Sequence, residues 1–178
     1  MDLTKTVELR PSDSNAYYKL GALYFIKEDY VRAVANYSKA IELPNGLYTQ
    51  EAYSGRGAAY NNLKNYDYAI ADYTKSIELC LANDYKSSLA DTYRRRGKSY
   101  RNRGMYYALR SEADRASNDY ERAISDYTKA IGIEPQNSES YYGRSYVYSL
   151  SLEKDLAEAD KKKADELFAE EQKRKPAN

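Results

Sequence analysis

The chain has 178 residues, with 28 Lys and Arg against 27 Asp and Glu, so its formal net charge is +1. This balance excludes a polyanion-binding surface spread over the whole chain, while a local basic surface stays open. One cysteine and no histidine exclude an intrachain disulfide and remove the commonest general base and zinc ligand. No apolar run approaches the roughly 18 residues that span a bilayer, so we expect no membrane insertion.

Tyrosine is the unusual component of the chain, with 22 Tyr against 2 Phe and no Trp. A tyrosine ring packs as an apolar group but keeps a polar tip. The 4 prolines and 8 glycines are few, which is typical of helices joined by short turns rather than of an all-β protein. We therefore expect an all-α fold.

Two short segments recur along the chain. The first reads AYYKLGALY from Ala16, AYSGRGAAY from Ala52, TYRRRGKSY from Thr92 and SYYGRSYVY from Ser140. The second follows the first three copies and reads YVRAVANYSKAIEL from Tyr30, YDYAIADYTKSIEL from Tyr66 and YERAISDYTKAIGI from Tyr120. In the second segment tyrosine and small residues recur every three or four positions, which predicts a helix.

These segments resemble the tetratricopeptide repeat, a helix–turn–helix unit of about 34 residues. The first helix of that family has an aromatic residue, Leu-Gly and Tyr, and here these places hold Tyr17, Leu20, Gly21 and Tyr24 in the first copy. Later copies depart from the pattern, because Arg56 and Arg96 stand where leucine is expected. The resemblance implies a right-handed α-solenoid of stacked antiparallel helix pairs, with glycines at close helix contacts and tyrosines packed between helices.

In chain order, the resemblance divides the sequence into an end of a preceding repeat helix and four repeats. The segments are residues 1–13 for the preceding helix end, then 14–47, 50–83, 90–137 and 138–171 for the repeats. The fourth repeat is degenerate, and its last helix is expected to cap the array to about residue 175. Because the chain starts in mid-repeat, we expect it to be cut from something longer, which leaves the cytoplasm as a default localisation only.

The third repeat is longer than the others, because Tyr120 follows Tyr100 at a much wider spacing than Tyr30 follows Tyr24. The difference, about 14 residues or four helical turns, is an insertion around residues 104–118. The insertion has no proline and one glycine, and we expect it to be helical. Either about seven residues lengthen each helix by two turns, or a single longer second helix starts near Met105.

In the resembled family the first helices line a concave groove that commonly holds an extended peptide. Transferring the groove-facing places to this chain gives the candidate partner-binding residues, which are Tyr18, Lys19, Asn61, Asn62, Arg94, Arg95, Lys98, Arg101, Asn102, Tyr142 and Tyr146. One subclass of the family binds the C-terminal carboxylate of chaperones with five Lys, Asn and Arg residues. Of those places only Arg95 matches, so we do not expect that ligand.

A basic cluster in the third repeat is the sharpest local feature. Arg94, Lys98 and Arg101 follow at i, i+4 and i+7 and share one helix face. Arginine forks bind carboxylates or phosphates, so one hypothesis places an acidic or C-terminal segment of a partner here, flanked by Tyr142 and Tyr146. The alternative is that the arginines pair with acids such as Asp91 and Glu139 and form a solvated surface.

The sequence therefore favours a non-enzymatic scaffold that binds a peptide or helix of another protein. No nucleophile motif, phosphate loop or metal-ligand spacing is present, so we expect no metal site and no cofactor. Carboxylates such as Asp67 and Asp72 are expected on helix surfaces. Two alternatives stay open: nucleic-acid binding by the arginines and exposed tyrosines, which the acids of the groove disfavour, and self-assembly through the exposed ends of the array.

Overall fold

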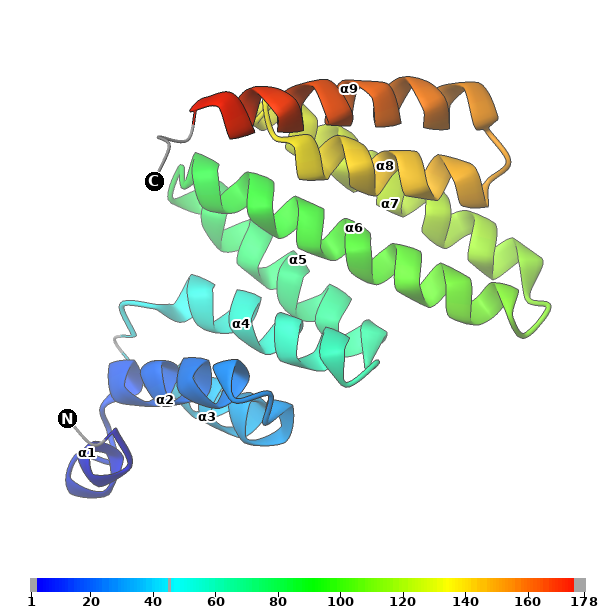
Figure 1. Cartoon of the computed structure of the whole chain (residues 1–178). Coiled ribbons are helices and arrows are strands. Elements are labelled where there is room, and N and C mark those ends of the chain that lie inside the picture. The colour runs from blue at the N-terminus through cyan, green and yellow to red at the C-terminus, as the bar shows by residue number, and fades with distance from the viewer. Residues whose placement is uncertain (1–2, 45, 175–178) are drawn as a thin grey trace. The chain divides into compact units, whose positions relative to one another are not determined.

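The computed structural model describes residues 3–44 and 46–174, and this part of the chain folds into helices joined by short turns, without a strand (Figure 1). The prediction of an all-α fold is confirmed. Among the described helices, none combines the length and the apolar character needed to cross a membrane. The helices are α1 (Leu3–Leu9), α2 (Ser14–Ile26), α3 (Tyr30–Glu42), α4 (Thr49–Asn62), α5 (Tyr66–Ala82), α6 (Lys86–Ala108), α7 (Ala113–Ile133), α8 (Ser138–Leu150) and α9 (Lys154–Arg174).

Polar side chains and left-handed residues determine where several of these helices begin and end. The Asp13 carboxylate accepts a hydrogen bond from the backbone N–H of Ala16 at 3.0 Å, and Asn137 caps α8 in the same way. Such caps satisfy backbone donors that the first helical turn leaves free. The turns inside the helix pairs contain residues with positive φ, which are Glu28, Lys64, Ser111 and Leu152.

The chain divides into two units, one ending at Asp84 and the other beginning at Tyr85. In the first unit α2 packs on α3 and α4 on α5, while α3 and α4 join the two pairs and α1 packs on α2. In the second unit α6 packs on α7 and α8 on α9, while α8 contacts both α6 and α7. Each unit is therefore a stack of two antiparallel helix pairs.

Tyrosines of the second helices form the core between neighbouring pairs. A Cβ built at Gly21 would lie 2.8 Å from Cδ1 of Tyr37, and one built at Gly55 would lie 2.6 Å from its Cζ. Tyr37 is thus enclosed by glycines of α2 and α4 and is buried. The glycines are needed because a side chain at either place would occupy the volume of the ring.

Arginine replaces the expected leucine because it pairs with an aspartate of the second helix. Arg56 Nε donates to Asp72 Oδ2 and Arg56 Nη2 donates to Asp72 Oδ1, both at 2.8 Å. Arg96 pairs with Asp126 in the same bidentate way. The expectation that Asp72 lies on a helix surface is wrong, since Asp72 is only 6% exposed; the guanidinium compensates its buried charge.

The insertion in the third repeat repeats this pairing one heptad further along. Arg103 Nε donates to Asp119 Oδ2 at 2.8 Å. Arg103 lies one heptad after Arg96, and Asp119 lies one heptad before Asp126. A heptad is close to two helical turns, so the added pair falls on the same faces of the two helices.

Each helix of this pair has therefore gained one heptad. The first helix, α6, continues to Ala108, and the second helix, α7, begins only at Ala113. Of the two forms left open by the sequence, the structure has the one in which both helices are longer. The alternative, a single second helix starting near Met105, is not observed.

Candidate partner-binding groove

The second unit contains an open groove of about 630 Å³ between α6 and α8. It brings together six of the residues predicted from sequence: Arg94, Arg95, Lys98, Arg101, Tyr142 and Tyr146. The remaining lining residues are Asp91, Tyr127, Glu139 and Gly143.

The helices α6 and α8 run in parallel along this groove. Arg94 Nε lies 3.1 Å from Glu139 Oε2, and the Arg101 guanidinium lies 5.0 Å from the centre of the Tyr146 ring. The two contacts have the same offset in sequence, and they are one heptad, or about 10 Å, apart along each helix. The groove therefore has one end at Arg94 and Glu139 and the other at Arg101 and Tyr146.

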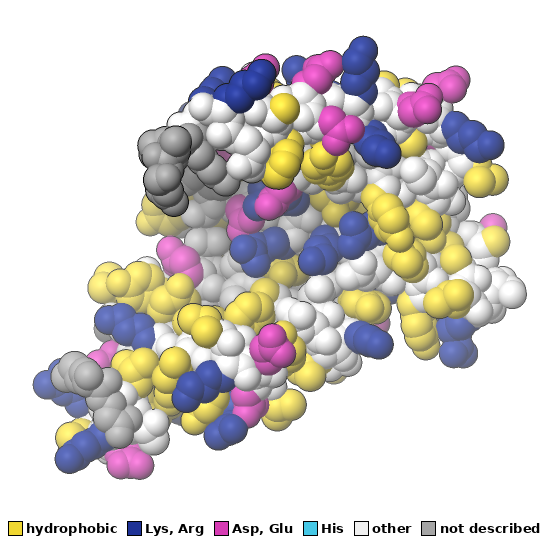
Figure 2. Space-filling model, in the orientation of Figure 1, with side chains coloured by type: hydrophobic (Ala, Val, Ile, Leu, Met, Phe, Trp, Pro, Cys, Tyr) yellow, Lys and Arg dark blue, Asp and Glu magenta, His cyan; other side chains and the backbone are white. Residues whose placement is uncertain are grey.

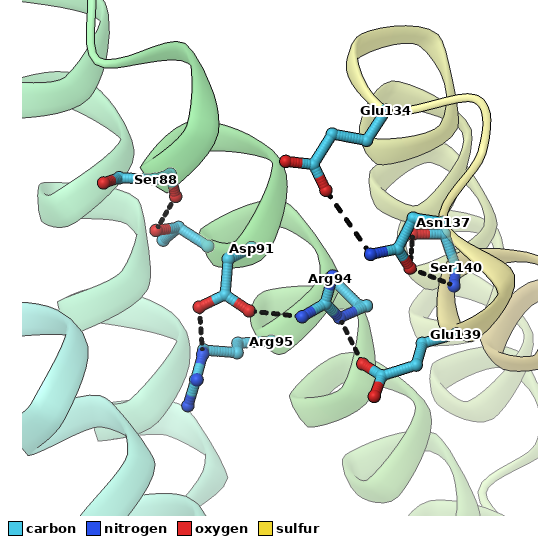
Figure 3. A network of polar contacts seen from close by, with 9 residues as sticks. Ser88, Asp91, Arg94, Arg95, Glu134, Asn137, Glu139 and Ser140 are labelled. Carbon is cyan, nitrogen blue, oxygen red and sulfur yellow. Dashed lines mark hydrogen bonds and ion pairs between the residues drawn. The ribbon is translucent and has the colours of Figure 1, made fainter. Parts of the chain in front are cut away.

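At the first end the basic side chains are neutralised by acids of the chain (Figure 3). Asp91 accepts from Arg94 Nη2 through one oxygen and from Arg95 Nε through the other, both at 2.5 Å. Glu139 reaches Arg94 from α8 and is itself largely exposed. For Arg94 and Arg95 the structure thus shows the pairing that was the alternative to a binding role.

At the second end the positive charge is not compensated. Lys98 is exposed and makes no ion pair or hydrogen bond with the residues that the structure describes. Arg101 donates to the amide oxygen of Asn102 at 3.1 and 3.3 Å and lies over the Tyr146 ring, but within the described ranges it contacts no carboxylate. Asn102 itself does not line the groove, and its contact with Arg101 orients the guanidinium.

The floor of the groove is aromatic and closely packed. Tyr127 of α7 is 2% exposed, and a Cβ at Gly143 would lie 2.3 Å from its Cε1. Burial raises the pKa of the Tyr127 phenol, while the positive charges of Arg101 and Arg94 lower it. The phenol is therefore neutral, and the floor offers an apolar ring between charged walls.

Tyr142 on the α8 wall is oriented by a contact with α9. Its hydroxyl donates a short hydrogen bond to Asp165, and this bond raises the pKa of Tyr142. This hydrogen bond connects Tyr142 to α9, the second helix of its own pair. The ring itself remains exposed beside the groove.

Four predicted residues belong to the first unit and are not part of this groove. Tyr18 stacks on Tyr48 with ring centres 4.8 Å apart, and burial, followed by the charge of Glu51, raises its pKa. Lys19 is exposed on α2. Asn61 and Asn62 lie on α4, where the Asn62 amide donates to a carbonyl of its own helix at 2.9 Å.

Sequence reasoning missed two residues of the groove, Tyr127 and Gly143. The resemblance implies that repeat tyrosines such as Tyr127 pack between helices, and Tyr127 is indeed buried, but it also lines the groove. Gly143 precedes Arg144 just as Gly55 precedes Arg56. This shared position in the repeat was the sequence feature from which the role of Gly143 could have been inferred. Within the described part of the chain, no group of three or more Cys, Asp or Glu side chains could hold a metal ion.

Two models of one family match the sequence. Both are described as tetratricopeptide repeat; one matches residues 51–80 and the other residues 14–46 and 106–137, together more than half of the chain. The chain belongs to the tetratricopeptide repeat family. This confirms the resemblance seen in the sequence and the assignment to an all-α repeat fold.

Several solved structures are similar in fold to this chain. A crystal structure of MamA has 24% identity and a TM-score of 0.75, covering 96% of this chain and 87% of that one. MamA 41-end from Desulfovibrio magneticus RS-1 has 18% identity and a TM-score of 0.74, covering 94% and 82%. The Arabidopsis OM64 TPR domain has 24% identity and a TM-score of 0.58, covering 76% and 94%. These likenesses show the fold, and among curated proteins no sequence relative is found.

Proposed function

We propose that the groove of the second unit binds an acidic segment of another protein, with Lys98 and Arg101 pairing with its carboxylates. The tetratricopeptide repeats support a protein-interaction scaffold, and proteins of this family are typically non-enzymatic. The observation behind the finer proposal is the uncompensated charge of Lys98 and Arg101 beside a neutral aromatic floor.

The charges of the groove favour this partner over a neutral one. Arg94 and Arg95 are balanced by Asp91 and Glu139, so the remaining positive charge belongs to Lys98 and Arg101. A carboxylate placed between these two side chains would accept charge-assisted hydrogen bonds, each worth about 1.5–3 kcal/mol. The rings of Tyr142 and Tyr146 would limit the access of water to these bonds and so strengthen them.

A capture experiment with matched charge reversals tests the proposal. The wild type, Lys98→Glu/Arg101→Glu and the control Lys161→Glu/Lys162→Glu are used as baits in an extract of the source cell. The control lies on the exposed face of α9 and changes the net charge by the same amount. All three proteins should show the same helical content before use.

We expect one protein to be recovered by the wild type and the control but not by the groove variant. Replacing Asp and Glu by Asn and Gln in the segment of that protein which binds should then abolish binding to the wild type. Equal recovery by the groove variant would overturn the proposal, as would equal loss with both variants. Recovery of nucleic acid that disappears after nuclease treatment would overturn it in favour of nucleic-acid binding.

A further inference from the structure

The basic end of the groove continues along α6 into an apolar surface. Met105 follows Arg101, and Leu109 follows Met105, at i+4 spacings, which keeps them on the helix face of Lys98 and Arg101. Figure 2 shows a row of Lys and Arg side chains over α6, followed by hydrophobic side chains toward the C-terminal end of that helix. Charge and apolar surface are thus adjacent on one face.

Leu109 is exposed because the neighbouring helix ends before it. The register between α6 and α8 places Met105 opposite Leu150, the last residue of α8. Both of these side chains pack against the buried cluster around Tyr120. Leu109 lies one turn further, at the start of the turn between α6 and α7, and is 87% exposed.

We infer that the segment bound in the groove carries an apolar side chain next to its acidic one, and that this side chain packs on Leu109 and the adjoining edge of Met105. The inference rests on the proposed function and adds a specificity to it. An acidic residue alone would be bound by Lys98 and Arg101. An acidic residue with an apolar neighbour at the correct distance would also cover Leu109.

The spacing required of the partner follows from helix geometry. Lys98 and Met105 stand at i and i+7, and Arg101 and Leu109 at i and i+8, which is about 10–12 Å at roughly 1.5 Å per residue. A helical partner covers this distance between positions i and i+7 of one face. An extended partner covers it in about three residues, at about 3.3 Å each.

The inserted heptad of α6 supplies this apolar end. Met105 and Leu109 lie within the insertion of the third repeat, so a repeat of ordinary length would have no α6 residues at this place. The insertion therefore lengthens the groove beyond α8 and changes the chemistry of its end from basic to apolar. A partner of the stated pattern is bound by both the ordinary and the added part of α6.

Fluorescence anisotropy with labelled peptides tests the inference. Two probes carry Glu-Glu and a leucine, placed at i+3 in an extended peptide and at i+7 in a helix-stabilised peptide; a third has alanine for the leucine. The proteins are the wild type, Leu109→Asn, the control Leu152→Asn and Lys98→Glu/Arg101→Glu. Leu152 is a suitable control because it is a similarly exposed leucine in a turn outside the groove.

We expect one of the leucine probes to bind the wild type about ten-fold more tightly than the alanine probe. Burial of a leucine side chain on binding is expected to change the affinity by about this factor. Leu109→Asn should abolish this difference, and Leu152→Asn should preserve it. The inference is overturned if the leucine probes bind no more tightly than the alanine probe, or if Leu109→Asn does not change their affinity. Failure of the proposed function is distinguished by Lys98→Glu/Arg101→Glu, which would then bind all three probes like the wild type.

Discussion

Asp72→Asn removes the negative partner of Arg56 inside the first unit, and we expect it to lower the free energy of unfolding by about 3 kcal/mol. Asp72 accepts two hydrogen bonds of 2.8 Å from the guanidinium. Hydrogen bonding to Asp72 raises the pKa of Arg56, and the arginine stays charged even without this partner, because a guanidinium does not lose its proton in proteins. The variant therefore leaves a half-buried positive charge without a counterion.

The size of the effect follows from the surroundings of the pair. Breaking a buried ion pair from one side costs about 3–5 kcal/mol. The Arg56 side chain is 20% exposed, and Arg56 Nη1 also donates to Ser38 at 2.9 Å. Both features reduce the penalty, so the lower end of the range is expected. Arg56→Leu should cost about as much, because it leaves the buried Asp72 carboxylate unpaired.

The first repeat shows how both losses can be compensated. It has Leu20 and Asn36 at the places of Arg56 and Asp72, so the double variant Arg56→Leu/Asp72→Asn reproduces a pair that the chain already contains. Replacing a buried ion pair by groups of similar volume is often close to neutral. We expect the double variant to lie within about 1 kcal/mol of the wild type.

Urea unfolding followed by circular dichroism measures all four proteins, and their stabilities are compared only if the denaturant slopes agree. The single losses sum to about 6 kcal/mol, so a double variant within about 1 kcal/mol of the wild type would lose about 5 kcal/mol less than that sum. A double variant whose loss equals that sum would refute the reasoning. In that case the arginine and the aspartate would contribute independently rather than as a pair.

Three further predictions concern backbone strain and helix packing and can be checked by thermal unfolding. Leu152→Gly should stabilise the second unit by about 1 kcal/mol, because Leu152 has a φ of 64° that glycine adopts without strain; an unchanged midpoint would contradict this. Gly132→Ala should stabilise by about 0.5–1 kcal/mol, since a Cβ there meets none of the described atoms within 4 Å. Gly143→Ala should destabilise by about 1–3 kcal/mol, because its Cβ would overlap the Tyr127 ring, and the reverse order of the two alanine variants would contradict the packing.

The helix pairs could be predicted because their contacts recur at constant spacing. The enclosure of Tyr37 by Gly21 and Gly55 involves only adjacent helix pairs, and Tyr127 is enclosed in the same way by Gly97 and Gly143. Arginine at the leucine place was read as a departure from the family pattern, although its explanation was present in the sequence. An aspartate stands immediately before the repeat aromatic at Asp72 and Asp126, where the first repeat has asparagine.

The candidate site was only partly predictable. Helical spacing alone placed Lys98 and Arg101 on one face. It could not show that Arg94 is neutralised by Glu139, because that contact depends on the register between two helices that are not consecutive in the chain. The exposure of Leu109 was likewise hidden, since it depends on where α8 ends and not on any residue of α6.

The Arg–Asp pairs of the third repeat have a consequence for how such a hairpin can change length. Arg56 and Asp72 are separated by 16 positions in the sequence, and Arg96 and Asp126 by 30. The difference is two heptads, one for each helix, and a heptad returns an arginine to nearly the same face of its helix. Adding one heptad to both helices therefore extends the hairpin by about 10 Å and keeps the Arg–Asp pairs on the same faces of the two helices, so the hairpin can lengthen at its turn without loss of the pairing between its helices.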